Sequence, residues 1–467
     1  MSAKSGRKSI YFLRLEIENV RCFAEKQVLD LVGSNNLPAR WNLIVGDNGV
    51  GKTTLLQCLA WMRPVPYFDP KTETQTGIQP SLHDQDTPDM QRQIGIQPWL
   101  NDRDTPDMER LLRDGASPTA LRAEMVELPT LDSFCSSTGR IRTGIMFGAT
   151  KNKLTRVRLT ENEPEKTVEP FFIPYAANRH MGHQNAARLS EAEPDDLLRT
   201  DSTELVDAAD VLSRLDHSAL KGNPKSKACL DSLKRALVNI LPFINEASDI
   251  DVRDPVEPGG RLRFRTPYGD VSLDGLSLGH RTVTAWIVDL AWRLVKRYPE
   301  STKPLEEPAV VLIDEIDLHV HPRWQRTIMQ QISGHFTNVQ FVATTHSPMM
   351  VGSMTGVNVA VLRQTEAGDH VVIENEPEVV EGWRVDQILV SLFGLETARS
   401  LRVEELMKER ERLLEKKSYS PHERERLREI ADELSSLPTA ERTEDLEAMR
   451  VIREAAADIR ARQVDRK

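Results

Sequence analysis

One short stretch of the sequence constrains the fold more than any other. The apolar run "WNLIVG", residues 41–46, predicts a buried strand, and Gly46-Asp47-Asn48-Gly49-Val50-Gly51-Lys52-Thr53 follows it directly. The pattern G-x-x-x-x-G-K-[ST] between a strand and a helix is typical of a loop that cradles phosphate groups. The glycines let main-chain N–H groups curl around the anion, Lys52 reaches the β and γ oxygens, and Thr53 offers its hydroxyl to Mg²⁺. We expect this loop and Thr54 to bind ATP.

The surrounding sequence predicts an α/β fold. Residues 12–20 alternate between apolar and polar side chains, which indicates strands of a sheet. A helix is expected from Leu55 to about Met62, ended by Pro64 and Pro66. The segments "EPFFIPYAANRH" and "GGRLRFRTPYGDVSL" predict further strands, and most of residues 185–245 is expected to be helical.

A second apolar run supplies the acids that a phosphate loop needs. Ala309 to Ile313 predicts a buried strand that ends at Asp314 and Glu315. We expect Asp314 to hold the Mg²⁺ shell, while Glu315 accepts a proton from the attacking water. Two acids at this place could instead cap a helix.

A third predicted strand, "VQFVATTH", ends at His346, thirty-one residues after Glu315. An isolated histidine after a strand usually carries no function. Because this one ends the strand that follows the acids, we expect its imidazole to hydrogen-bond the γ-phosphate.

The distance between the two motifs points to a large insertion, since Lys52 and Asp314 lie 262 positions apart. Leu276 to His280, "LSLGH", resembles the Leu-Ser-Gly-Gly-Gln signature of ABC-type ATPases and precedes Asp314 at a similar spacing. The stretches "IENVRCF", "DEIDLHVHP" and "TTHSP" are similar to the SMC-, RecF- and OLD-like branch of that class. The resemblance covers residues 10–65 and 260–365.

The resemblance implies an ABC-type head in which ATP lies between two copies. Ser277 and Gly279 of one copy would complete the phosphate site of the other, so a homodimer or a higher even oligomer is expected. The Ser277 hydroxyl, the Gly279 main chain and the following helix N-terminus present donors to an anion. Leu278 and His280 replace the family's glycine and glutamine, which leaves the contact with the γ-phosphate open. The alternative is a plain helix cap.

The segment "VDQILVSLFGLETARS" and the charged tail after it resemble the ATPases of Septu-type anti-phage defence systems. These work beside a separate HNH nuclease, so the resemblance implies a sensor or regulatory subunit whose nuclease is another chain. An OLD nuclease would require a TOPRIM domain after the ATPase core, where this sequence predicts helices, with a capping box at Ser420 to Glu423.

Residues 77–90 recur at 95–108 with eleven identities in fourteen positions, which indicates a duplication. Each copy places Thr, Pro and Asp where a helix begins, so a structural insertion is favoured over a recognition loop or a carboxylate metal site. The predicted organisation is an N-terminal head lobe with the phosphate loop (1–66), an insertion with the repeat (67–135), head strands (136–184), a helical subdomain (185–250), a C-terminal head lobe with signature, acids and histidine (251–400), and a helical tail for partner binding or dimerisation (401–467).

Charge and composition limit the remaining functions. The chain has 61 Lys and Arg against 71 Asp and Glu, so extensive coating of nucleic acid is not expected. A hairpin at residues 140–158 gathers basic side chains, which leaves local DNA contact open beside the favoured solvated face. The four cysteines are scattered, and no apolar run approaches a membrane span, so we expect a cytoplasmic protein without a membrane segment.

Three functions fit these motifs. The first is an ATP-hydrolysing switch that controls a separate effector. A RecF-like ATPase acting on DNA ends or gaps is the second, and a scaffold that binds ATP without hydrolysing it is the third. A transporter subunit fits least, because the 225 positions between Lys52 and Ser277 exceed what such subunits carry.

Overall fold

The structure is a computed structural model of the whole chain. It describes residues 9–33, 35–62, 64–67, 95–98, 119–128, 130–131, 140–150, 153–161, 171–182, 202–252, 262–376, 383–395, 399–416 and 419–436. The chain divides into two compact units, Met1–Gly394 and Leu395–Lys467. All the predicted nucleotide-binding residues belong to the first unit.

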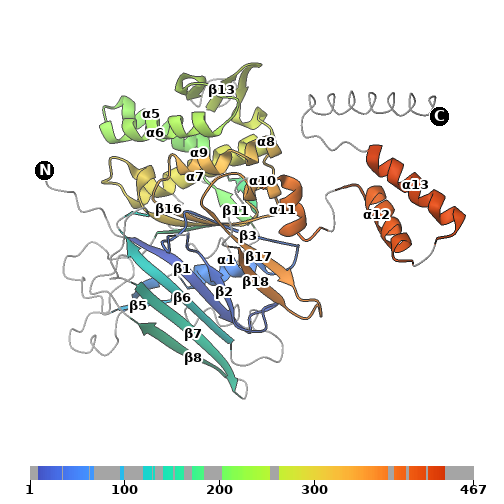
Figure 1. Cartoon of the computed structure of the whole chain (residues 1–467). Coiled ribbons are helices and arrows are strands. Elements are labelled where there is room, and N and C mark those ends of the chain that lie inside the picture. The colour runs from blue at the N-terminus through green and yellow to red at the C-terminus, as the bar shows by residue number, and fades with distance from the viewer. Residues whose placement is uncertain are drawn as a thin grey trace. The chain divides into compact units, whose positions relative to one another are not determined.

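A six-stranded mixed sheet forms the centre of the first unit (Figure 1). Its strands follow the order β18-β17-β3-β16-β15-β9; β18 is antiparallel to its neighbour and the others are parallel. Every residue of β3, β9, β15 and β16 is buried, as expected for parallel strands covered on both faces. The strands are β3 (Trp41–Gly46), β9 (Phe172–Tyr175), β15 (Ala309–Ile313), β16 (Val339–Thr345), β17 (Val357–Gln364) and β18 (Val371–Glu376).

The side chains of this sheet alternate between two hydrophobic clusters. On β3, Trp41 and Val45 enter the cluster shared with the helices, while Ile44 enters the cluster on the opposite face. Trp41 also stacks on Phe341 of the neighbouring strand, with ring centroids 4.2 Å apart. The helices of the first face are α5 (Ala208–Leu220), α6 (Pro224–Ile240), α7 (Leu278–Arg297) and α9 (Ile328–Ser333).

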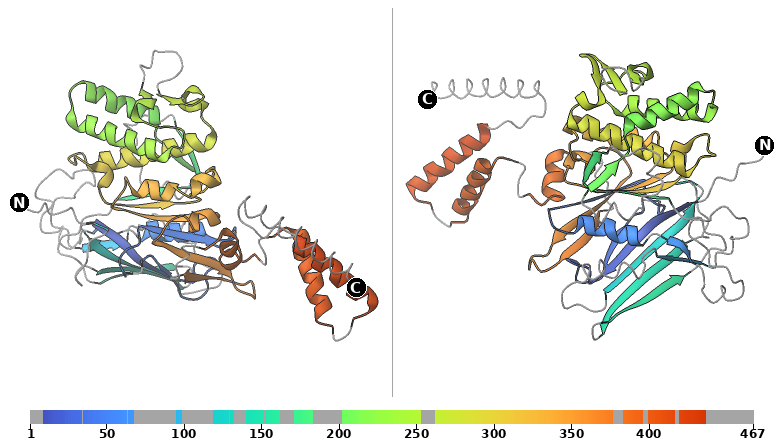
Figure 2. Two further views of the ribbon diagram at one scale, coloured as in Figure 1. Left: turned by 45° about the horizontal axis from the view of Figure 1, so that its top comes forward. Right: turned by 180° about the vertical axis from the view of Figure 1, so that it is seen from behind.

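The opposite face packs on helix α1 and on an antiparallel sheet, a layering that Figure 2 shows from two further directions. This second sheet has the order β2-β1-β6-β7-β8. The last part of the segment 67–135, assigned to an insertion from the sequence, therefore belongs to the head, because β6 pairs with β1. The elements are α1 (Lys52–Trp61), β1 (Ser9–Glu18), β2 (Gln27–Asp30), β6 (Thr119–Leu128), β7 (Arg140–Thr150) and β8 (Lys153–Glu161).

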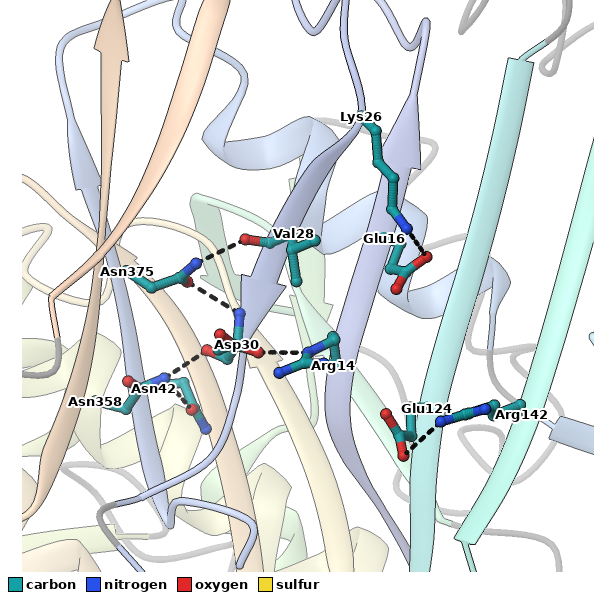
Figure 3. Close-up of polar contacts among 10 residues, drawn as sticks. All are labelled: Arg14, Glu16, Lys26, Val28, Asp30, Asn42, Glu124, Arg142, Asn358 and Asn375. Atoms are coloured by element: carbon teal, nitrogen blue, oxygen red, sulfur yellow. Dashed lines mark hydrogen bonds and ion pairs between the residues drawn. The ribbon is translucent and has the colours of Figure 1, made fainter. Parts of the chain in front are cut away.

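Polar contacts join the two sheets along β2 (Figure 3). The Asp30 carboxylate accepts from Arg14 Nε at 2.6 Å, while its main-chain N–H donates to Asn375 of β18 at 3.0 Å. Asn358 of β17 donates to the Asp30 carbonyl at 2.6 Å and to the side chain of Asn42 at 3.0 Å. These bonds fix the antiparallel sheet against the strand that carries the phosphate loop.

Smaller elements complete the first unit. The predicted hairpin at 140–158 is confirmed by the β7–β8 pairing, and β5 is the described part of the tandem repeat, whose other residues lie outside the described ranges. The remaining described elements are β4 (Pro64–Tyr67), β5 (Gly95–Pro98), β10 (Asn178–Met181), β11 (Ser202–Leu205), β12 (Ile250–Val252), β13 (Leu262–Thr266), β14 (Gly269–Ser272), short 3-10 turns (Ala247–Asp249, Leu273–Gly275 and Pro304–Glu306), α8 (Pro322–Gln325), α10 (Pro348–Val351) and α11 (Val385–Ser391).

The described part of the second unit contains two helices, α12 (Leu401–Leu414) and α13 (Pro421–Ser436), which contact each other. Arg426 of α13 donates through two nitrogens to the carboxylate of Glu409 on α12, each at 2.8 Å. The predicted capping box is confirmed, since Ser420 N donates to Glu423 at 2.8 Å and Glu423 N donates back to Ser420 Oγ at 3.3 Å. Across the described residues, every helix is too short or too polar to cross a membrane.

The predicted α/β fold, a mixed sheet with flanking helices and a phosphate loop, is confirmed. The start of the first helix also differs from the prediction: the helix expected from Leu55 begins at Lys52, because Gly51 adopts a left-handed conformation that turns the chain directly into the helix.

Candidate active site

The predicted phosphate loop leaves β3 and enters α1 at the carboxyl end of the parallel strands, the edge where ligands of open α/β sheets bind. Gly51 has φ +93°, and a Cβ there would lie 2.6 Å from the Cys22 sulfur. Gly49 has φ +81°, but a Cβ there would meet nothing within 4 Å. The loop is thus packed tightly where it joins the helix and open at its middle, which suits the approach of an anion.

Lys52 is buried at the start of α1, with only 7% of its surface exposed. Its ammonium group donates to the carbonyl oxygens of Gly46 at 3.0 Å and Asp47 at 2.7 Å, so the side chain folds back into the loop. Burial lowers the pKa of Lys52, and the nearby carboxylates, Asp314 first, oppose the shift. The lysine therefore lies among phosphate-loop carbonyls and the predicted acids, while its contact with phosphate stays a prediction.

The structure brings the two distant motifs together at Thr53 and Asp314. Thr53 Oγ1 donates to Asp314 Oδ2 at 2.7 Å, across 261 positions of sequence. A hydroxyl and a carboxylate at this distance are the oxygen ligands that Mg²⁺ takes in nucleotide sites. The pair fits the predicted metal. The described residues contain no group of three or more His, Cys, Asp or Glu side chains that could hold a metal ion.

Thr344, which the sequence analysis did not single out, connects the two acids. Its hydroxyl donates to Asp314 Oδ1 at 2.6 Å and accepts from the main-chain N–H of Glu315 at 2.7 Å. Thr344 belongs to β16, beside the strand that ends at Asp314, and is fully buried. In the sequence, the short polar run "TTH" at the end of an apolar strand could have pointed to Thr344.

Glu315 has an unusual main chain for a residue with a side chain. Its φ is +49°, in the left-handed region that costs about 1–2 kcal/mol for non-glycine residues. Such strain persists only where the surroundings hold it, and it concentrates at functional sites. The carbonyl oxygens of Asp314 and Glu315 accept bonds from Arg179 of β10 at 2.5 and 2.8 Å, a contact that sequence reasoning missed.

His346 directly follows β16, which ends at Thr345, one residue before the predicted end, and His346 is half-buried. Its main-chain N–H donates to the carboxylate of Asp317 at 3.3 Å, which ties the loop after the acids to this strand end. The role of the imidazole as a phosphate sensor is not tested by these contacts.

The predicted signature lies at the start of α7. Ser277 is the N-cap residue, and its hydroxyl accepts from His280 N at 3.5 Å and contacts His280 Nδ1 at 3.0 Å. A Cβ on Gly279 would lie 2.1 Å from the carbonyl oxygen of His319, so this glycine is required by packing against the loop after Glu315. The helix cap is therefore present, and the contact of Ser277 and Gly279 with a nucleotide of another copy stays a prediction.

Leu278 and His280, which differ from the ABC-type signature, have different surroundings in the structure. His280 turns inward, with its ring 4.7 Å from Phe243 and 5.4 Å from Trp324, and burial lowers its pKa. Leu278 is 49% exposed. The rest of the helix buries an apolar stripe at helical spacing, formed by Val283, Trp286, Ile287, Leu290 and Leu294.

A second arginine that sequence reasoning missed adjoins the phosphate loop. Arg21, from the stretch "IENVRCF", donates to Thr54 Oγ1 at 3.0 Å and to Gln57 at 3.2 Å. In the basic hairpin, Arg142 lies 3.6 Å from the carboxylate of Glu124 (Figure 3), and the other basic side chains lie outside the described ones.

Parts of the chain are similar to known proteins. Two family models match: "AAA domain, putative AbiEii toxin, Type IV TA system" over residues 151–351, and "AAA domain" over residues 14–63. The Retron Vc95 probable ATPase of Vibrio cholerae is 40% identical over 111 residues, 22% of this chain and 22% of that protein. The Septu protein PtuA of Bacillus mycoides is 30% identical over 207 residues, 44% of this chain and 27% of that protein.

These matches span less than a third of the length of either relative. The SMC head domain from Thermotoga maritima aligns with a TM-score of 0.40 at 12% identity, covering 78% of this chain and 98% of that one. The predicted relationship to Septu ATPases is confirmed: the chain has an ATPase-type domain and is related to PtuA and to retron ATPases.

Proposed function

We propose that this relative of the Septu PtuA proteins binds ATP with Mg²⁺ and hydrolyses it to ADP and phosphate. The observation that carries the proposal is the 2.7 Å hydrogen bond from Thr53 to Asp314, because it joins the phosphate loop to the acidic strand end. Beside it lie a buried lysine and a glutamate whose main chain is held in a strained conformation. A phosphate loop needs these parts together to hydrolyse a nucleotide.

The residues of the site have separate roles in this proposal. The phosphate loop, Gly46 to Thr54, binds the phosphates, and Lys52 exchanges its bonds to loop carbonyls for phosphate oxygens. Thr53 and Asp314 would hold Mg²⁺, which supplies Lewis-acid stabilisation of charge on the phosphates. Glu315 takes the proton from the attacking water, and His346 hydrogen-bonds the γ-phosphate.

A pair of copies is part of the proposal. Ser277 and Gly279 lie at the N-terminus of α7, whose unpaired N–H groups attract anions, and the exposed Leu278 between them faces outward. They would complete the phosphate site of a second copy in a homodimer or higher even oligomer. Glu315→Gln is expected to keep ATP bound and therefore to stay paired, so that size-exclusion chromatography with light scattering gives a larger mass with ATP than without it. An unchanged mass with ATP bound would refute pairing driven by ATP.

The biological role follows from the relatives rather than from the site. We infer a cytoplasmic regulatory ATPase of an anti-phage defence complex that controls a separate HNH-like nuclease, because the chain is similar to PtuA and to retron ATPases. The charged helices α12 and α13 form a unit of their own, which suits a docking element for that partner. A co-purification of the neighbouring gene products with this chain tests the partner directly.

ATP hydrolysis is tested by phosphate release from the purified full chain. Lys52→Ala is expected to abolish turnover, since the buried ammonium group is removed from the loop. Lys225→Ala is the control, because Lys225 is exposed and forms a surface ion pair with Glu300 at 2.7 Å. Turnover that survives Lys52→Ala would contradict the proposal, and binding of ATP without any turnover in the unmodified chain would favour the scaffold.

A further inference from the structure

One buried cation lies behind the predicted acids rather than among them. Arg179 belongs to β10 and is 8% exposed. Its Nη1 donates to the carbonyl oxygen of Asp314 at 2.5 Å and to that of Ala176 at 2.9 Å, while Nη2 donates to the carbonyl oxygen of Glu315 at 2.8 Å. Within the part of the chain that is described, all hydrogen bonds of Arg179 go to main-chain carbonyls.

This arrangement is costly, which argues that it serves a purpose. A buried arginine is usually paired with a carboxylate, as Arg293 is with Asp289 at 2.6 Å. Arg179 has main-chain carbonyl partners instead. The charge of Arg179 is thus removed from water while its guanidinium holds the carbonyls of two consecutive residues, Asp314 and Glu315.

The two carbonyls bracket the strained residue. Glu315 has φ +49°, and its N–H is fixed by Thr344 at 2.7 Å on one side while its carbonyl is fixed by Arg179 on the other. Removal of either anchor lets the peptide relax toward an ordinary conformation, which redirects the Glu315 side chain. A planar guanidinium spans both carbonyls at once, whereas a lysine ammonium group does not.

We propose that Arg179 is a positioning residue that holds the main chain of Asp314 and Glu315, and thereby aims the Glu315 carboxylate at the attacking water. The proposal rests on the ATPase function proposed above. Arg179 itself contacts neither nucleotide nor metal in this role; it acts through Glu315.

The test compares two conservative changes in the full chain, Arg179→Lys and Arg293→Lys. Both shorten an arginine that is largely shielded from solvent, but Arg293, 12% exposed, bonds Asp289 and not the acidic strand end. Arg179→Lys is expected to lower kcat by about 100-fold, as for a misplaced catalytic group, while the affinity for a fluorescent ATP analogue stays close to that of the unmodified chain. Arg293→Lys is expected to lower the unfolding temperature without this selective loss of kcat.

A double variant shows whether Arg179 acts through Glu315. In a Glu315→Gln background the residual turnover is expected to be unchanged by Arg179→Lys, because the residue that Arg179 positions is already inactive. An equal loss in both backgrounds would overturn the proposal, as would a parallel fall of kcat and ATP affinity.

Hydrogen exchange of the nucleotide-free chain separates this proposal from the ATPase function. Arg179→Lys is expected to speed exchange in residues 309–320, and Arg293→Lys is not. Unchanged exchange in that segment would overturn the positioning role even if the chain hydrolyses ATP. If the unmodified chain has no turnover, the ATPase function and the catalytic part of this proposal both fall, and faster exchange would then assign Arg179 to holding the strand end alone.

Discussion

Substitution of Gly279 by alanine sets two effects of known size against each other. Gly279 lies in the first turn of α7, where alanine normally stabilises a helix by about 0.4–1 kcal/mol. A Cβ at this position would lie 2.1 Å from the carbonyl oxygen of His319, a main-chain atom that cannot rotate away. Overpacking of this kind costs about 1–3 kcal/mol, so Gly279→Ala is expected to lower the free energy of unfolding by about 1–2 kcal/mol.

Gly334→Ala is the matched control for this prediction. Gly334 is the C-cap of α9 with φ −67°, and the nearest atom to a Cβ would lie 3.5 Å away, an ordinary contact. Alanine there is expected to raise the free energy of unfolding by about 0.4–1 kcal/mol. Urea denaturation followed by circular dichroism measures both variants. A gain of stability in Gly279→Ala similar to that in the control would refute the packing of the signature against the loop after Glu315.

Three further changes test other contacts of the head. Thr344→Val removes a buried hydroxyl that bonds Asp314, so urea denaturation is expected to show a loss of about 1–3 kcal/mol and phosphate release to slow; unchanged turnover would separate Thr344 from the acids. Asp289→Asn leaves the buried Arg293 without its charge partner and is expected to cost about 3–5 kcal/mol in the same assay, whereas a loss below 1 kcal/mol would mean that the ion pair matters little. Burial lowers the pKa of His280 below its ordinary 6.5, so as the pH falls the unfolded chain takes up this proton before the folded chain does, and the stability that neutral His280 contributes is lost below about pH 6.5. When the pH is lowered, the free energy of unfolding of His280→Gln should therefore fall less than that of the unmodified chain. Equal slopes for the two proteins would contradict this.

Much of the site was predictable because its motifs are local. The phosphate loop, the acids after β15 and the histidine after β16 each combine an apolar strand with the residues that follow it, and the structure places all three strands side by side. The helix after the signature was predictable for the same reason, since its apolar stripe repeats within one segment.

The missed residues depend on pairing between distant segments. Thr344 reaches Asp314 because β16 lies beside β15. Arg179 reaches the carbonyl of Asp314 because β9 pairs with the other side of β15 and leads into β10. Gly279 matches a signature position in the sequence, but its packing against His319 appears only when α7 meets the loop after Glu315. The pairing of β1 with β6 was equally hidden, since β6 follows β1 about a hundred residues later and neither strand's sequence identifies its distant partner.

A mixing experiment tests the central claim most directly, namely that one copy completes the ATP site of another. Lys52→Ala removes the phosphate-loop lysine, and Ser277→Arg blocks the signature; each variant alone is expected to be inactive. In an exchanged equimolar mixture, half of the dimers carry both defects in one site and an intact second site. Phosphate release should then recover to about a quarter of the unmodified rate. A mixture that stays as inactive as its two components would contradict the shared site.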